Sequence, residues 1–233
     1  MTYGKKYAAK AKLVKPEKLY VVEEALALLP QTARAKFDET IDLAIKLGVD
    51  TVKNPSVRGT ISLPAGSGKK KKIAVITRPE RIKEAEEAGA STVGSDDLIE
   101  KIKNGFLDFD VLIASPDMMA SVGKLGKTLG TKGLMPNPKS GTVTAEVGKA
   151  VKEFMGGKVE FKMDKSGVIH LGMGKASFTA EALKNNLMAA LNTIIHARPS
   201  GFKGVFIKSV VVSTTMGPGI KIDPRLAIEE ASK

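Results

Sequence analysis

The stretch LPAGSGKKKKIAVITRPERIKEAEEAG, residues 63–89, marks a change of rhythm in the chain. Its first ten residues combine a proline, two glycines and four lysines, which is typical of a linker between folded parts. The apolar run KIAVITR then predicts a strand, and PERIKEAEEAG predicts a helix that ends at Gly89. A strand followed at once by a helix is the repeating unit of parallel α/β sheets.

This alternation continues as far as the glycine pair 156–157. DVLIAS predicts a buried strand, and three further segments predict helices, the first of them capped by Ser95 and ended by Gly105. The predicted strand covers 110–115, and the predicted helices cover 95–105, 116–129 and 144–157. We therefore expect residues 67–158 to form a small, three-layer, mainly parallel α/β (Rossmann-like) domain.

The two outer parts of the chain share a different style. Phe37, Ile41, Leu43, Ile45 and Leu47 alternate along one predicted strand, interrupted only by Glu39. The other predicted elements are a helix over 16–29 with proline in its first turn, a strand over 57–63, a hairpin over 158–174 turning at 165–167, a helix over 179–197, a strand over 204–215 and a tail from 216. We expect residues 1–66 and 159–233 to form one discontinuous α+β domain with an antiparallel sheet, into which the α/β domain is inserted.

Composition restricts the classes of function. The chain has 233 residues, no cysteine, and 37 Lys plus Arg against 25 Asp plus Glu, a formal net charge of +12. Disulfides, thiolate metal sites and cysteine nucleophiles are thereby excluded. The sequence contains no run of 18 apolar residues, so it predicts no membrane span. The basic N-terminus lacks the apolar region of a secretory signal. The charge favours a nucleic-acid partner, and 5% aromatic residues without tryptophan favour structured RNA or duplex over stacked single strands.

Two segments resemble nucleotide-binding motifs but lack residues that those motifs require. LPAGSGKK has Leu63 where a phosphate-binding loop needs its first glycine and Lys70 where it needs a hydroxyl. GMGKAS, residues 172–177, has serine in place of the last glycine of a dinucleotide fingerprint. The two histidines, His170 and His196, share no metal-ligand spacing. We expect no enzyme activity, no catalytic residue, no bound metal and no cofactor.

One basic stretch has a distinct composition. GTKGLMPNPKSGTVT, residues 130–144, contains two X-Pro bonds that disfavour helix and central strand over 133–140. Four lysines are concentrated here and just before it, among glycines whose N–H groups an anion could approach; they are Lys124, Lys127, Lys132 and Lys139. A solvated basic face explains the same lysines equally well.

Five ordered motifs resemble one family. They are KFDETIDLAIKLGVD, VRGTISLP, GLMPNPKSGTVT, DKSGVIHLGMGKASF and TTMGPGIKID. Together they resemble the large-subunit ribosomal proteins that form the mobile stalk beside the exit site, the first in the large-subunit naming series. The similarity runs from about Lys5 to Asp223, and the length and short basic N-terminus resemble the bacterial form.

The resemblance implies a function. Members of this family bind the ribosomal RNA (rRNA) of the stalk at a three-way junction, assist release of deacylated tRNA from the exit site, and repress translation of their own mRNA through a mimic of that site. It also implies a cytoplasmic, ribosome-bound protein that is monomeric when free and has no membrane partner. The rival hypotheses are a phosphate- or nucleotide-handling enzyme that uses the inserted domain and a basic adaptor for an acidic protein.

The resemblance also implies which residues contact RNA. They are Lys36, Phe37, Thr40, Lys162, Asp164, Lys165, Gly167, Ser177, Thr215, Met216 and Gly217. Hydroxyls and backbone groups suit ribose 2′-OH groups, and Phe37 and Met216 offer apolar contact in a shallow minor groove. Two interpretations of Phe37 stay open, because its alternation with Ile41 equally predicts core packing. Asp164 would repel phosphate, so we expect it to bond a ribose hydroxyl or to order its turn.

Overall fold

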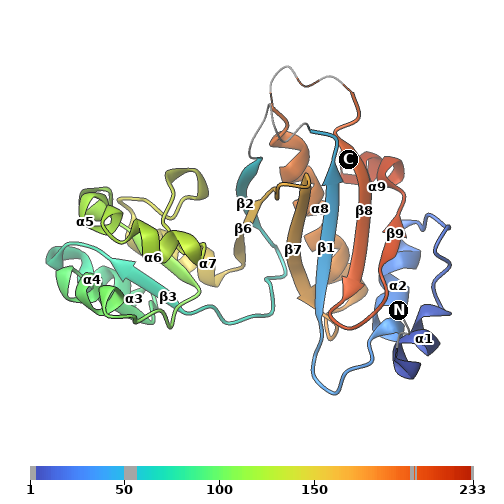
Figure 1. Ribbon diagram of the computed structural model, residues 1–233, viewed down its shortest axis with the longest axis horizontal. Helices are drawn as coiled ribbons and strands as arrows, with labels where there is room; N and C mark the ends of the chain where they lie inside the picture. The colour runs from blue at the N-terminus through green and yellow to red at the C-terminus, as the bar shows by residue number, and fades with distance from the viewer. Residues whose placement is uncertain (1–3, 50–56, 200–201, 203, 232–233) are drawn as a thin grey trace. The chain divides into compact units, whose positions relative to one another are not determined.

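The chain folds into two units, each built around its own main sheet. The computed structural model describes residues 4–49, 57–199, 202 and 204–231, without the side chain of Lys139. It divides into unit 1, Met1–Gly68 with Val159–Lys233, and unit 2, Lys69–Lys158 (Figure 1). Unit 1 contains an antiparallel four-stranded sheet and unit 2 a parallel three-stranded sheet. The predicted fold class, a discontinuous α+β domain with an inserted α/β domain, is confirmed.

The main sheet of unit 1 has the strand order β7-β1-β8-β9, and every neighbouring pair is antiparallel. The elements of this unit are α1 (Lys5–Ala11), α2 (Val22–Thr32), β1 (Thr40–Leu47), β2 (Arg58–Ser62), β6 (Lys158–Lys162), β7 (Val168–Lys175), α8 (Ala180–His196), β8 (Ile207–Thr214), β9 (Ile220–Ile222) and α9 (Pro224–Ala231). The central strand β1 thus lies between strands that are more than 120 residues away in sequence.

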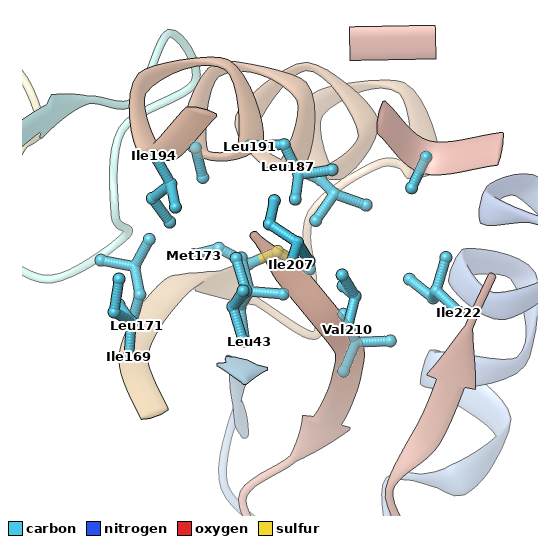
Figure 2. Packing of buried hydrophobic residues seen from close by; sticks show 14 of the residues in the cluster. Leu43, Ile169, Leu171, Met173, Leu187, Leu191, Ile194, Ile207, Val210 and Ile222 are labelled. Carbon is cyan, nitrogen blue, oxygen red and sulfur yellow. The ribbon is translucent and has the colours of Figure 1, made fainter. Parts of the chain in front are cut away.

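The core of unit 1 lies between one face of this sheet and its helices. The inward-facing residues of β1 are Ile41, Leu43, Ile45 and Leu47, all at most 1% exposed. The sheet side chains point toward Leu187, Leu191 and Ile194 of α8, as Figure 2 shows. The period-2 alternation that predicted this strand is the signature of a sheet buried on one face only. The opposite face of the sheet is therefore left for solvent or a partner.

The segment between β6 and β7 turns as predicted but does not make a continuous hairpin. β6 pairs with β2 in a separate two-stranded sheet, whereas β7 pairs with β1. Next to the turn, the two arms are linked by the bridge between Met163 and Ile169 and by a hydrogen bond from Asp164 N to Val168 O (2.9 Å). The expected hairpin over 158–174 is thus wrong in its pairing, because the first arm is taken by β2.

Two expectations near the chain ends are also wrong. The predicted helix over 16–29 begins only at Val22, because Tyr20 is extended along β9 and receives a hydrogen bond from Asp223 N (3.0 Å) while donating to Lys221 O (2.9 Å). Leu19, which lies within the range predicted as helix, is 52% exposed. The predicted tail instead supplies β9 and α9, and Ile222 and Ala227 are part of the core.

Unit 2 has the strand order β4-β3-β5, with both pairs parallel. Its elements are β3 (Ile73–Ile76), η1 (Pro79–Arg81), α3 (Ile82–Glu87), β4 (Thr92–Gly94), α4 (Asp96–Lys103), β5 (Val111–Ala114), η2 (Pro116–Met118), α5 (Met119–Gly123), α6 (Gly126–Thr131), η3 (Pro138–Ser140) and α7 (Val147–Met155). Helix α3 ends before Gly89, whose φ of 94° lies in the left-handed region that glycine adopts at little cost.

Three layers form unit 2, as the alternation of strands and helices predicted. Ile73 and Val75 of β3 pack with residues of α3 and α7, such as Ala85 and Phe154. Ala74 and Ile76, on the opposite face, pack with α4, α5 and α6. A strand buried on both faces reads as a continuous apolar run, which IAVI is.

Two local predictions for unit 2 need correction. The helix predicted over 116–129 is broken into η2, α5 and α6. Ser95 occupies the N-cap position of α4, but its side chain makes no capping hydrogen bond. Segment 133–140 contains no strand and no α-helix, but the short 3-10 helix η3 occupies 138–140, where helix was not expected. The Leu134–Met135 pair of this segment packs on the α4–α6 side of the core. Among the described residues, no helix is long and apolar enough to cross a membrane.

Candidate nucleic-acid interface

The predicted RNA-contact residues gather at opposite ends of the unit 1 sheet. We call them the Phe37 end, made of Lys36, Phe37, Thr40, Ser177, Thr215, Met216 and Gly217, and the Lys165 end, made of Lys162, Asp164, Lys165 and Gly167. Register places Thr40 opposite Lys175 and Lys46 opposite Val168 on the antiparallel strand β7. Thr40 and Lys46 are six positions apart along β1, so the two ends are about 20 Å apart. In Figure 1 they are the lower and upper ends of β1.

The loop before β1 presents its apolar residue to solvent. Phe37 is 59% exposed and Lys36 is exposed, although the alternation begins cleanly at Ile41. Glu39 takes the inward position instead, at 1% exposure. Core packing of Phe37 is therefore wrong. An exposed phenylalanine on a loop held beside a sheet is available for contact with a flat partner surface.

Glu39 is buried with both carboxylate oxygens occupied. Oε1 accepts from Arg34 N (2.7 Å) and Ala35 N (2.6 Å), and Oε2 accepts from Met216 N (3.0 Å). Burial acts to raise the pKa of Glu39, but the backbone donors of Ala35, Met216 and Arg34 outweigh it and hold that pKa below the ordinary value. Glu39 is therefore a hydrogen-bonded anion that joins the loop before β1 to the turn after β8.

The turn after β8 is held on its other side by β1. Thr215 N donates to Thr40 O (3.0 Å), and Thr40 N donates to the Thr215 hydroxyl (3.0 Å). Arg34 Nε donates to Met216 O (2.6 Å). With its backbone fixed in this way, the Met216 side chain is 43% exposed.

Gly217 is required for space rather than for an unusual φ. Its φ is not positive, so the backbone conformation does not itself require glycine here. A Cβ at this position would lie 2.3 Å from Thr214 Oγ1 and 3.3 Å from Thr32 O. Thr214 is buried and β-branched, so it cannot move aside easily. Any side chain at 217 must displace the turn.

Ser177 and Thr40 are joined to neighbours at the same end. The Ser177 hydroxyl donates to Asp38 Oδ2 (2.8 Å), and its backbone N–H donates to Asp38 Oδ1 (3.2 Å). Lys175 Nζ donates to the Thr40 hydroxyl (3.0 Å). Lys175 thus brings a positive charge to the Phe37 end, which the resemblance did not assign to it.

The Lys165 end is a tight turn ordered by Asp164. Its Oδ1 accepts from Ser166 N and Val168 N, both at 2.8 Å, and Gly167 has a φ of 76°. The Val168 N–H is the main cause that holds the pKa of Asp164 below its ordinary value. Of the two roles expected for Asp164, ordering of the turn is thus present without RNA. Lys165 is exposed on this turn, as is Lys162 on β6.

An open sheet face connects the two ends. Asp42, Ala44 and Lys46 alternate with the buried residues of β1 and point away from the helices. Their cross-strand neighbours on this face are Val168, His170 and Gly172 of β7 and Ser209, Val211 and Ser213 of β8. Figure 1 shows α8 behind the sheet and no helix of this unit over the face turned to the viewer. The two ends and the face between them form what we call the sheet surface.

Sequence reasoning missed the middle of the sheet surface. Asp42, Lys46 and His170 are at least partly exposed, and the alternation that marked Leu43 and Ile45 as buried already places Asp42 and Lys46 on the other face. Burial raises the pKa of Asp42, while His170 and Lys175 act in the opposite direction. His170 Nε2 also lies 3.9 Å from Asp164 Oδ2. The surface therefore mixes both signs of charge with hydroxyl groups.

The lysines of unit 2 form a more open basic region. Lys124, Lys127 and Lys132 are exposed on α5, α6 and their junctions; the Lys139 side chain lies outside the described structure. Gly133 donates its backbone N–H to Gly130 O (3.2 Å) and is not free to bind an anion. The exposure of these lysines is what the interpretation as a solvated basic face predicts.

The motifs that resembled nucleotide-binding loops have other structural roles. GMGKAS forms the end of β7 and the loop after it, rather than a strand-to-helix turn. The loop of LPAGSGKK is held by the buried side chain of Asn186, which accepts from Ala65 N (3.0 Å) and donates to Gly66 O (2.9 Å). Within the described ranges, no group of three or more His, Asp or Glu side chains could hold a metal ion.

Comparison with known families gives one match. The sequence model of the ribosomal protein L1p/L10e family matches residues 29–218. The chain belongs to the ribosomal protein L1p/L10e family. The matched range begins in α2, includes all of unit 2, and ends one residue after Gly217, so every predicted RNA-contact residue lies within it.

Membership of the L1p/L10e family settles the broad class of function. The chain is a large-subunit ribosomal protein that binds rRNA, and it is not an enzyme. The hypothesis of a phosphate- or nucleotide-handling enzyme is therefore wrong. The near-miss motifs at 63–70 and 172–177 are structural loops of a ribosomal protein.

Proposed function

We propose that the sheet surface of unit 1 binds the rRNA of the mobile stalk at its three-way junction. The observation that carries this proposal is the exposure of Phe37 and Met216 on two segments that Glu39 and Arg34 tie together. Fixed apolar side chains among hydroxyls and lysines suit the wide, shallow minor groove of folded RNA, where ribose 2′-OH groups are displayed.

The lysines around the sheet surface supply the part of the affinity for RNA that does not depend on the RNA sequence. Lys36, Lys162 and Lys165 are exposed, and Lys46 and Lys175 border the open face. Lysine neutralises phosphate as a point charge, whereas recognition of the junction falls to the hydroxyls, backbone groups and apolar side chains. Because the lysines neutralise phosphates and other groups recognise the junction, the surface can carry acids such as Asp42 and still attract RNA.

The same surface serves regulation in this proposal. An mRNA leader that copies the junction would occupy it in place of rRNA, so that the free protein, a cytoplasmic monomer, represses translation of its own message. On the ribosome, the protein would move with the stalk and assist release of deacylated tRNA. The exposed lysines 124, 127 and 132 of unit 2 are suited to meet tRNA phosphates.

Sequencing of RNA cross-linked to the protein in cells tests the proposal. We expect the reads to concentrate in one segment of large-subunit rRNA and in one mRNA leader upstream of the protein's own coding sequence. Reads spread in proportion to the abundance of cellular RNAs would contradict specific recognition. Peaks in rRNA without a leader would leave rRNA binding intact and remove the regulatory part.

A further inference from the structure

The carboxylate of Glu39 occupies an unusual position for an acid. It is 1% exposed and lies directly before β1, a strand whose inward residues are apolar. A buried carboxylate is costly unless its lone pairs are satisfied. Here they accept three backbone N–H groups, two from positions 34 and 35 and one from position 216. The acid therefore bridges segments that are about 180 residues apart in sequence.

Neighbouring bonds make this bridge part of a closed ring. Arg34 donates its side-chain Nε to Met216 O, so residue 216 is held at both its N–H and its C=O. Thr40 and Thr215 exchange two further bonds across the strands. Phe37 lies on the loop inside the ring and Met216 lies on the turn, both with exposed side chains.

We propose that Glu39 is a positioning residue for RNA recognition, which holds the Phe37 loop and the Met216 turn in their binding arrangement before RNA arrives. The inference rests on the proposed function of the sheet surface. Glu39 itself is too buried to touch RNA, so its effect on binding must pass through the two segments that it joins. Segments that are ordered in advance spare the complex the cost of ordering them, and this raises affinity.

The chemistry of the bridge requires two acceptor oxygens. A glutamine has nearly the same shape but offers one oxygen and one NH₂ group. Whichever way its amide turns, at least one of the three backbone donors faces another donor. Glu39→Gln should therefore weaken the link between the loop and the turn while preserving volume in the core.

The test compares the affinity of full-length variants for an rRNA fragment that spans the stalk junction and for a plain RNA duplex. Glu39→Gln should bind the junction about tenfold more weakly, the scale of one lost hydrogen bond to a charged group, and bind the duplex as the native protein does. Glu24→Gln is the matched control, because it removes the same charge from an exposed site of α2, where Glu24 pairs with Lys18. It should leave both affinities unchanged.

A double-mutant cycle separates positioning from general destabilisation. If Glu39 acts through the Met216 turn, the double variant Glu39→Gln with Met216→Ala should lose less junction affinity than the product of the two single fold-losses. Glu39→Gln with Lys165→Ala, whose sites are at opposite ends of the sheet, should combine multiplicatively. Native affinity in Glu39→Gln, or a multiplicative effect with Met216→Ala, would overturn the proposal.

Hydrogen exchange of the native protein without RNA provides a measurement that no folding defect can confuse. The backbone amides of Arg34, Ala35 and Met216 lie outside helices and strands, yet they should exchange slowly because each donates to a buried carboxylate. Rapid exchange at these positions would show that the Glu39 bridge does not hold the two segments, and would overturn the proposal. If the native protein failed to prefer the junction over the duplex, the proposed function would fail while the exchange result still decided the role of Glu39.

Discussion

Replacement of Met216 by alanine distinguishes a recognition residue from a core residue. Truncation of a fully buried methionine costs about 2–5 kcal/mol of unfolding free energy, because it loses apolar burial and leaves a cavity. Met216 is 43% exposed on a turn whose backbone is fixed by Glu39, Arg34 and Thr40. Truncation there opens no closed cavity, so we expect the free energy of unfolding to fall by less than about 1 kcal/mol.

The expected loss of RNA affinity follows from the exposed fraction. Full burial of a methionine side chain is worth about 1.5–3 kcal/mol. If RNA covers the 43% of Met216 that the free protein exposes, the contact is worth about 0.6–1.3 kcal/mol, or roughly a threefold to ninefold change in affinity. This loss should appear for the stalk junction and not for a plain duplex, because the side chain carries no charge.

Leu226 gives a matched control for this experiment. It is 44% exposed, nearly the same as Met216, but it lies on α9, on the helical side of unit 1. Leu226→Ala should change neither affinity. The assay is a thermal melt of each variant together with titration of a labelled junction fragment at fixed salt. A Met216→Ala protein that melts many degrees early and binds the junction normally would refute the reasoning, as would an equal loss of affinity in Leu226→Ala.

Three further predictions concern charge, packing and domain structure. If about six phosphates are neutralised, affinity for the junction should fall on the order of a thousandfold between about 50 and 200 mM salt, as measured by titration, and a flat response would remove the role of the lysines. Gly217→Val should abolish specific binding and lower the melting temperature, because its side chain collides with Thr214; native binding would show that the turn tolerates the bulk. A chain joining 1–68 to 159–233 through a short glycine linker should fold and keep most specific affinity, since it retains Asn186 and the loop that it holds; a folded chain without affinity, measured by circular dichroism and titration, would place the main site in unit 2.

The sequence predicted those elements whose patterns are set by local burial. The alternation over 40–47 and the apolar run over 73–76 correctly distinguished a sheet buried on one face from one buried on both. It failed where a distant partner decides the conformation. Tyr20 is extended rather than helical because it pairs with Ile222, about 200 residues away, and no local pattern contains that pairing.

The candidate site shows the same division. Alternation alone would have buried Phe37, and the family resemblance was needed to expect it on the surface; the structure shows it exposed. Glu39 looked like an interruption of the apolar pattern, whereas it is buried because three backbone donors stabilise its charge. Such a role depends on the turn after β8 and could not be predicted from the residues around it.

Ultraviolet cross-linking of the full chain to a stalk-junction rRNA fragment, with the cross-linked peptides mapped by mass spectrometry, tests the central claim most directly. The account predicts cross-links within residues 34–46, 162–177 and 209–217, which contain the two ends and the open face of the unit 1 sheet. Helices α8 and α9, on the other side of that sheet, should carry none. Cross-links confined to residues 69–158, or concentrated on α8 and α9, would contradict it.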